Sequence, residues 1–145
     1  MDNILIRKTK KEDVDSISRI QATITKAPVT TDFKQIVREQ IQKAEDVSLV
    51  AEYQGDVVGF MITYIFSGGF GIETSAWIAV FGVDPKFMGQ GIGKKLAEEV
   101  FKFYKAKNIT NIYTSVRWDS TDLLSFFKTL GFDRSDFINL RRVLE

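Results

Sequence analysis

The sequence predicts an α/β fold, in which amphipathic helices cover a sheet, and three observations support this prediction. Apolar stretches of strand length alternate with longer stretches whose apolar residues recur every three or four positions. Two apolar runs, 48–53 and 57–66, surround a Gln-Gly-Asp tripeptide at 54–56, which is typical of a β-hairpin. The segment 74–83 is apolar at both alternating sets of positions, as expected of a central strand covered by helices on both faces.

In the first half of the chain we expect a short strand at 4–7 and then two helices. Thr9 and Glu12 have the spacing of a capping box, which predicts a helix that continues to about residue 25. Asp32 is expected to cap a second helix that continues to about residue 44. The hairpin strands follow this helix.

In the second half, the central strand is followed by two further helices and two further strands. The segment 92–107 has the apolar period of a helix, and 112–118 is expected to be a strand. A last helix over 122–130 is stopped by Gly131, and a last strand is expected over 137–144. The whole pattern therefore predicts six strands and four helices.

Glycines occupy the alternate positions Gly89, Gly91 and Gly93, between the central strand and the third helix. Glycine has no Cβ atom to hold a ligand away from the backbone. The first amides of a helix have no intrahelical partner, and the helix dipole adds partial positive charge there. This combination binds phosphate, so the sequence predicts a phosphorylated cofactor at this turn.

Two common phosphate-binding motifs do not fit the glycine turn. A P-loop needs a glycine five residues before Gly93 and a Ser or Thr after Lys94, where the chain has Met88 and Lys95. A dinucleotide fingerprint needs a third glycine three residues further on, where the chain has Lys94 or Leu96.

The spacing that fits is Val-x-Pro at 83–85 followed by Gly-x-Gly at 91–93, which resembles the pyrophosphate-binding motif of the GNAT N-acetyltransferase superfamily. The segment 52–60 resembles the family's second hairpin, and 126–132 resembles its C-terminal signature. The resemblance covers nearly the whole chain. It implies one domain over 1–145, with a mixed, mostly antiparallel central sheet of six to seven strands flanked by about four helices.

The resemblance also implies acetyl-CoA as co-substrate. In the family, backbone amides of the glycine turn bind the pyrophosphate. Backbone N–H groups of the central strand polarise the thioester carbonyl, as an oxyanion hole does. The residues expected to bind acetyl-CoA are Phe81, Val83, Met88, Gly89, Gln90, Gly91, Ile92, Gly93, Lys94, Ser120 and Phe127.

Three positions depart from the pattern of catalytically active family members. Met88 stands where the family usually has Arg or Gln, although the amides do most of the phosphate binding. Phe127 stands where many members have the Tyr that protonates the departing thiolate. Ser115 stands where some members have a Glu.

Other side chains must then move the protons. Tyr113 and Tyr64 are candidates for the acid, and Glu73 and Asp119 are candidates for a base that acts through a water. A solvated strand-end carboxylate and a core aromatic ring are the structural alternatives for these residues.

Composition excludes several classes of chemistry. The chain of 145 residues has no Cys and no His, so it has no thiolate nucleophile and no Ser-His-Asp triad, and we expect no metal site. The net charge of +1 gives no electrostatic reason to expect nucleic acid or an anionic membrane as a partner. The segment 1–11 is charged and lacks the apolar region of a signal peptide, so we expect a cytoplasmic protein.

Two functions of different classes remain open, together with a third, less favoured one. The first is an N-acetyltransferase that moves an acetyl group to a primary amine, on a small molecule or a peptide, by direct attack. The second is a catalytically weak or inactive GNAT domain that binds acyl-CoA as a sensor or interaction module. The third is a nucleotide-binding α/β domain, which lacks the expected third glycine. The sequence allows a homodimer and does not identify the acceptor.

Overall fold

The computed structural model describes residues 3–28, 30–43, 45–68 and 73–145. Its contacts divide the chain into two compact units, Met1–Ser115 and Val116–Glu145, and each is described by itself. That residues 1–145 form one domain stays a prediction. Within the described residues, none of the helices is long and apolar enough to span a membrane.

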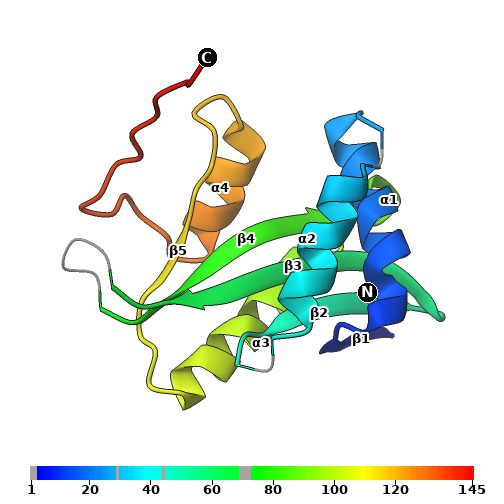
Figure 1. Cartoon of the computed structure of the whole chain (residues 1–145). Coiled ribbons are helices and arrows are strands. Elements are labelled where there is room, and N and C mark those ends of the chain that lie inside the picture. Colours follow the sequence, from blue (N-terminus) through cyan, green and yellow to red (C-terminus); the bar gives the residue numbers. More distant parts are fainter. Residues whose placement is uncertain (1–2, 29, 44, 69–72) are drawn as a thin grey trace. The chain divides into compact units, whose positions relative to one another are not determined.

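The first unit contains a five-stranded sheet in the order β1-β2-β3-β4-β5 (Figure 1). Neighbouring strands from β1 to β4 are antiparallel, and β4 and β5 are parallel. The predicted mixed, mostly antiparallel sheet is therefore confirmed. The strands are β1 (Ile4–Lys8), β2 (Ser48–Tyr53), β3 (Asp56–Phe66), β4 (Ser75–Val83) and β5 (Ile112–Thr114).

The predicted number of six to seven strands is wrong for the described residues. β5 ends at Thr114 rather than at residue 118, because the chain beyond it turns at Arg117, whose carbonyl accepts the Ser120 N–H at 3.1 Å. The segment 137–144 forms no strand. Its strand-like residues are largely solvated, with Ile138 81% and Leu140 88% exposed. Strand propensity needs a paired and half-buried surface to take effect.

Helices cover both faces of the sheet, as Figure 1 shows: α1 (Val14–Thr25) and α2 (Thr31–Ile41) lie on one face and α3 (Ile92–Ala106) on the other. These helices confirm three of the predicted ones. The core under α1 and α2 combines residues of both helices with those of β2 and β3: Val14, Ile17, Ile20, Val37, Val50, Val57, Phe60 and Ile62.

Two predicted helix caps are wrong. The Thr9 hydroxyl donates to the carbonyl of Ser48 at 3.2 Å, and the Asp13 carboxylate instead accepts the Lys10 N–H at 2.7 Å at the start of the 3-10 turn that leads into α1. Thr30, not Asp32, caps α2, because its hydroxyl accepts the Phe33 N–H at 3.1 Å. The helix ends at Ile41, and residue 44 lies outside the described residues.

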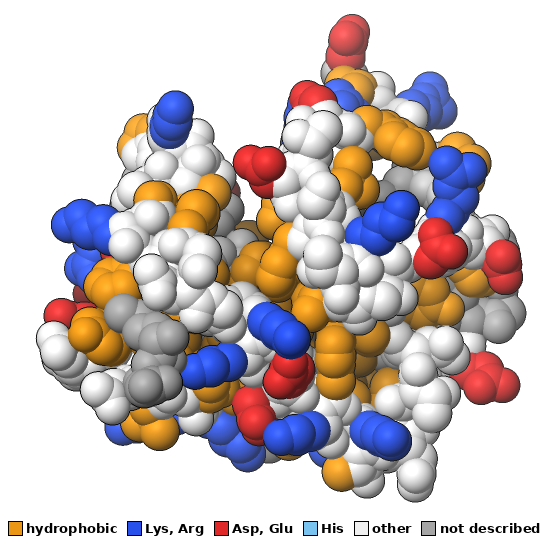
Figure 2. Space-filling model, turned by 180° about the vertical axis from the view of Figure 1, so that it is seen from behind, with side chains coloured by type: hydrophobic (Ala, Val, Ile, Leu, Met, Phe, Trp, Pro, Cys, Tyr) orange, Lys and Arg blue, Asp and Glu red, His pale blue; other side chains and the backbone are white. Residues whose placement is uncertain are grey.

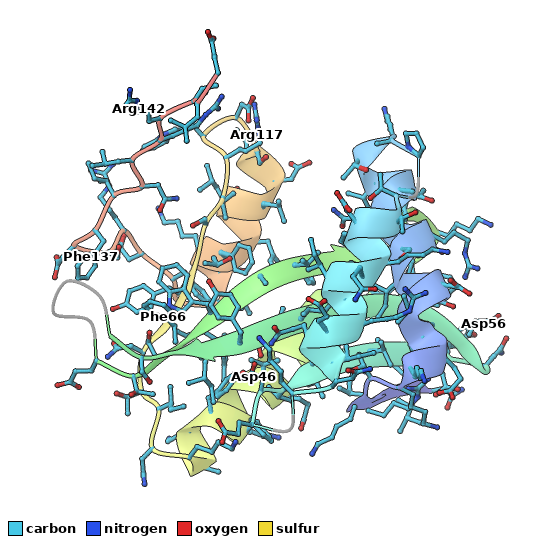
Figure 3. All side chains as sticks on the ribbon, viewed as in Figure 1. Asp46, Asp56, Phe66, Arg117, Phe137 and Arg142 are labelled. Atoms are coloured by element: carbon cyan, nitrogen blue, oxygen red, sulfur yellow. The ribbon has the colours of Figure 1, made fainter. Side chains whose placement is uncertain are left out.

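The predicted hairpin is confirmed. Gln54 and Gly55 have φ values of +50° and +85°, as both central residues of a type I′ turn do, and this turn matches the twist of the paired strands. Figure 3 labels the two ends of β3: Asp56 at this turn and Phe66 at the other end.

The second unit contains the predicted last helix, α4 (Thr121–Thr129). It ends as predicted at Gly131, which has φ +93°. The Gly131 N–H donates to the Lys128 carbonyl and the Phe132 N–H to the Phe127 carbonyl, both at 3.0 Å, so the helix end is a Schellman motif. Phe127 is buried, with its ring centroid 5.2 Å from those of both Phe126 and Phe132.

Candidate active site

An irregularity in the central strand marks the centre of the candidate site. Ile62 on β3 pairs with Val80 on β4, but Thr63 pairs with Ile78, so Ala79 is an extra residue opposite the two. A bulge of this kind bends its strand and changes the direction of nearby groups, and such bulges are over-represented next to active sites.

The parallel pairing of β4 and β5 ends one residue before this bulge. The ladder runs over three pairs and stops at Ile78 and Thr114. The Thr114 hydroxyl donates to the Ile78 carbonyl at 3.1 Å and so closes the ladder. From Ala79 to Val83, β4 continues in its pairing with β3 alone. This half of β4 is the expected position of the thioester.

The glycine turn begins immediately after β4 and is held to the sheet. The Asp84 N–H donates to the Val58 carbonyl at 2.8 Å, and the Asp84 carboxylate accepts the Lys86 N–H at 3.0 Å, which fixes a 3-10 turn at Pro85–Phe87. Gly89 and Gly91 have φ values of +81° and +79°, in the left-handed region that favours glycine. The conformation of the turn itself therefore favours glycine at both positions.

The start of α3 presents backbone donors without helical partners. Its first bond runs from the Lys95 N–H to the Gly91 carbonyl at 3.1 Å, so the N–H groups of 91–94 precede the helical ladder. The N-cap Gly91 has no side chain to cap them, and the first turn contains no acidic residue. The Lys94 side chain is 70% exposed beside this turn. These features favour an anion at the helix N-terminus.

Gly59 on β3 lets α3 approach the sheet closely. A Cβ atom at this position would lie 3.1 Å from Cγ2 of Ile92 and 3.4 Å from Cδ1 of Leu96. Ile92 and Leu96 are both buried in this contact. The backbone of β3 thus sets the position of the glycine turn, a role that sequence reasoning missed and that the Gly59 of the hairpin motif could have signalled.

The structure brings the predicted acetyl-CoA-binding residues of the first unit together in one continuous segment. Phe81 is half-buried and Val83 is buried on β4, and the turn and the start of α3 follow directly. Met88 is 55% exposed, and Gln90 is also exposed. Ser120 and Phe127 belong to the second unit, and their part in this site stays a prediction.

The predicted proton-transfer residues have different surroundings. Glu73 is exposed just before β4, and Tyr113 is half-buried on β5. Asp119, in the second unit, accepts hydrogen bonds from Arg117 at 2.9 and 3.0 Å, and these bonds hold the pKa of its carboxyl below the usual range. A lower pKa makes Asp119 a weaker base.

Three aromatic side chains meet across β3, β4 and β5. Tyr64 pairs with Trp77, and Trp77 pairs with Tyr113. The Trp77 ring centroid is 6.3 Å from that of Tyr64 and 4.9 Å from that of Tyr113, with interplanar angles of 11° and 25°. Sequence reasoning treated these residues singly, because their contact depends on the register that the bulge sets.

Two cavities in the first unit lie away from the glycine turn. One, of about 470 Å³, is lined by residues of β1, β2 and α3, and the other, of about 270 Å³, lies beside the end of α3 and the start of β5. No group of three Asp, Glu, His or Cys side chains within the described ranges could hold a metal ion. Figure 2 shows basic and acidic side chains mixed over one face of the molecule.

The chain belongs to the acetyltransferase (GNAT) family, whose model matches residues 14–132. This finding confirms the resemblance drawn from the motifs. The fold agrees: the structure of AAC(6')-Iy in complex with the bisubstrate analog CoA-S-monomethyl-acetylneamine aligns with a TM-score of 0.81 at 18% identity and covers 97% of this chain and 98% of that one. A transcriptional regulator from Bacillus halodurans C-125 aligns with a TM-score of 0.82 at 17% identity, covering 97% and 99%.

A curated relative, the mycothiol acetyltransferase of Amycolatopsis mediterranei, is 32% identical over 95 residues, which are 63% of this chain and 32% of the relative. The chain spans about a third of the length of the curated relatives it matches.

Proposed function

We propose that the protein is an N-acetyltransferase that moves an acetyl group from acetyl-CoA to a primary amine by direct attack. One observation carries the proposal: the N–H groups at the start of α3 precede its helical ladder, and they follow the half of β4 that no longer pairs with β5. A turn suited to phosphate and a stretch of β4 that no longer pairs with β5 then lie on one continuous segment, 79–94.

The residues of the turn suit the pyrophosphate of acetyl-CoA. Gly89 and Gly91 have open space where a side chain would lie, since no atom comes within 4 Å of a Cβ built there. The first turn of α3 adds positive dipole charge and contains no acidic residue, and Lys94 is 3.9 Å from the Glu98 carboxylate one turn further along the helix. Family membership supports the same co-substrate.

The reaction needs few catalytic side chains. Acetyl-CoA supplies an activated thioester, so no covalent enzyme intermediate is needed. The amine nitrogen forms a bond to the acetyl carbon while the carbon–sulfur bond breaks. The amine loses one proton and CoA leaves as its thiol. Backbone N–H groups near Phe81 and Val83 polarise the carbonyl, an effect worth about 3 kcal/mol for each well-placed donor.

Proton transfer is assigned to the exposed and half-buried groups around β4. Glu73 removes the amine proton through water, and Tyr113 protonates the thiolate. Asp119 is the second candidate base, but its lowered pKa makes it a weaker proton acceptor. A thiol with a pKa of about 8.5 is an adequate leaving group at neutral pH, so a weak acid suffices to protonate the thiolate.

The acceptor is a small-molecule or peptide amine, and neither nucleic acid nor a membrane surface takes part. A homodimer and a cytoplasmic location complete the proposal. The acetylneamine group bound by AAC(6')-Iy is that protein's own ligand and does not identify the acceptor of this chain.

Titration calorimetry with acetyl-CoA tests the proposal, using Gly91→Asp as the decisive variant. Asp tolerates the left-handed conformation better than most residues, so the variant folds, but its carboxylate repels pyrophosphate. We expect micromolar binding to the natural chain and a loss of about 100-fold, or roughly 2.7 kcal/mol, in the variant.

Two controls separate charge from conformation. Gly91→Asn has nearly the same shape without the charge and keeps most of the affinity. Gly55→Asp places the same carboxylate at a hairpin glycine with φ +85° and open space, and it keeps full affinity. Equal affinity in Gly91→Asp and the natural chain contradicts the proposal, as does tighter binding of ATP or NAD than of acetyl-CoA.

A second candidate function is a domain that binds acyl-CoA without efficient transfer. Phe127 favours it, because this ring has no proton to give and is packed between Phe126 and Phe132. Release of free CoA in the presence of an amine panel separates the two functions. Binding without release supports the second.

A further inference from the structure

Tyr64, Trp77 and Tyr113 form an aromatic wall on the sheet face that α1 and α2 cover. Alternate residues of a strand share a face, so Tyr64 lies on the same face as the buried core residue Ile62. Trp77 lies on the same face as Val80 although they are three positions apart, because Ala79 is the extra residue of the bulge.

The two helices leave this wall partly open. The core that they cover reaches as far as Ile62 and the adjoining Val80. Two pairs further along the sheet, Tyr64 and Trp77 are only half-buried, and Phe66, two residues beyond Tyr64 on the same face, is 43% exposed. Figure 3 labels Phe66 at this end of β3.

The wall adjoins the proposed reaction centre. Trp77 immediately precedes Ile78, where the pairing of β4 and β5 ends, and Ala79 of the bulge follows. A group that approaches the open half of β4 from the face of α1 and α2 therefore meets this wall. The glycine turn lies at the other end of β4.

The polar groups of the wall are few and neutral. The Trp77 indole N–H donates to the Ser75 hydroxyl at 3.2 Å, which fixes the ring and satisfies its donor. Burial raises the pKa of the Tyr64 phenol, so this hydroxyl stays protonated. The three wall residues are all neutral, so the wall offers a polycationic acceptor no further carboxylate beside the proposed base Glu73.

We infer that the aromatic wall is the acceptor subsite and that it selects a primary monoamine carrying an aromatic or other ring, in preference to a polyamine. A ring adds stacking and apolar contact with Trp77 and Tyr64. An ammonium group near these ring faces adds a cation–π attraction. This inference rests on the proposed function and specifies its substrate class.

The chain allows acceptor binding to be measured at Trp77 itself. It has two tryptophans, and Trp118 is 84% exposed in the second unit, so Trp118→Phe leaves Trp77 as the only one. With CoA present to prevent turnover, titration with phenethylamine should change the Trp77 fluorescence saturably. Half-saturation should lie at a concentration at least about tenfold lower than for n-butylamine or spermidine.

Kinetics provide the second measurement. Trp77→Leu should lower kcat/KM for phenethylamine at least about tenfold, mainly through KM, because ring contact is lost while the backbone site is unchanged. Trp77→Phe keeps an aromatic ring and is the control for a folding defect. Its kcat/KM for phenethylamine should stay within about threefold of that of the natural chain. Phe103→Leu, a half-buried aromatic of α3 on the opposite face, is the matched control.

The outcomes separate the two levels of the proposal. Failure of the natural chain to bind acetyl-CoA by calorimetry overturns the proposed function and the acceptor subsite together. Acetyl-CoA binding with a preference for spermidine, or with equal kcat/KM in Trp77→Leu and Phe103→Leu, overturns the acceptor subsite alone. Ring-dependent binding at Trp77 with a KM effect supports it.

Discussion

The two ends of β4 carry sites of different construction. Beyond its C-terminal end, the glycine turn offers main-chain N–H groups, and the side chain of Met88 is largely solvated. Near its N-terminal end, the aromatic wall offers side chains, with Trp77 between two tyrosines. The first site depends on backbone conformation and tolerates changes of side chain, whereas the second depends on which side chains are present.

Because the co-substrate site is made of backbone and the acceptor site of side chains, the acceptor can change while the co-substrate stays the same. Backbone conformation is fixed by glycines, a proline and packing against the sheet, all of which the rest of the fold constrains. Side chains on an open sheet face can change one at a time without moving the backbone. Under the proposed function, a backbone site of this kind binds acetyl-CoA with Met88 in place of the Arg or Gln that the family usually has.

A large loss of stability is expected from a substitution that moves the glycine turn as a whole relative to the sheet. Gly59→Ala puts a methyl group 3.1 Å from Ile92 and so pushes the start of α3 away from β3. We expect a loss of about 2 kcal/mol in the free energy of unfolding, typical of overpacking, and a loss of about tenfold in acetyl-CoA affinity. Denaturant unfolding and calorimetry measure these two quantities.

Gly82→Ala is the matched control on the opposite face of the sheet. Its methyl group would lie 2.7 Å from Cδ1 of Ile24 and 2.9 Å from the Phe60 ring, so it disturbs the packing of α1. We expect at least as large a loss of stability, because the contacts are closer, and a smaller loss of acetyl-CoA affinity than in Gly59→Ala, because the glycine turn stays in place although Gly82 itself lies on the segment 79–94. Equal losses of affinity in both variants would show that the turn responds to general destabilisation rather than to the contact at Gly59.

An intermediate loss of stability is expected at the ion pairs between Arg7 of β1, Asp13 of the 3-10 turn before α1 and Glu52 of β2. Asp13 accepts two hydrogen bonds from Arg7, at 2.8 and 2.9 Å, and Arg7 also donates to Glu52 at 2.8 Å. Burial by itself raises the pKa of Asp13, but the bonds from Arg7 and from the Lys10 N–H outweigh it, so the pKa lies below 3.8. The folded chain thus binds this proton less readily than the unfolded chain.

The stabilisation by Asp13 is therefore present above the pKa of the unfolded chain and is lost as the pH falls through the lower pKa of the folded chain. Asp13→Asn should cost about 1 kcal/mol at pH 7, the net value of a typical hydrogen bond, and the difference from the natural chain should vanish in acid. Unfolding by denaturant from pH 7 to pH 2 measures this. A difference that persists at pH 2, or a change in acetyl-CoA affinity at pH 7, would contradict the prediction.

The contrast between the two ends of β4 also explains which features could be predicted from the sequence. The glycine turn, the helices over 92–107 and 122–130 and the hairpin depend on local spacing and turn chemistry, and the structure has them where they were expected. The predicted cap at Thr9 does not form, because the Thr9 hydroxyl donates to Ser48, which is distant in sequence, and the Asp13 carboxylate instead accepts the Lys10 N–H at the 3-10 turn before α1. The aromatic wall depends on a bulge that shifts the register of β4 by one residue, which no local pattern reveals.

The expected strand over 137–144 failed for a related reason. Its alternating residues satisfy local strand propensity, but a strand also needs a partner at the correct register. In the second unit, Leu140 and Leu144 are 88% and 81% exposed, so the alternating residues lack the buried face that a strand requires.

The smallest effect is expected for Met88→Ala, which tests whether the glycine turn binds through its backbone or through a side chain. Met88→Ala removes a side chain that is 55% exposed and leaves the backbone of the turn unchanged. We expect acetyl-CoA affinity to stay within about threefold of the natural chain, or roughly 0.6 kcal/mol, because the N–H groups bind the anion. Calorimetry at two ionic strengths measures the change, with Gly91→Asp as the contrasting variant. A tenfold loss in Met88→Ala would contradict a site made of backbone, and would mean that the thioether itself contacts the co-substrate.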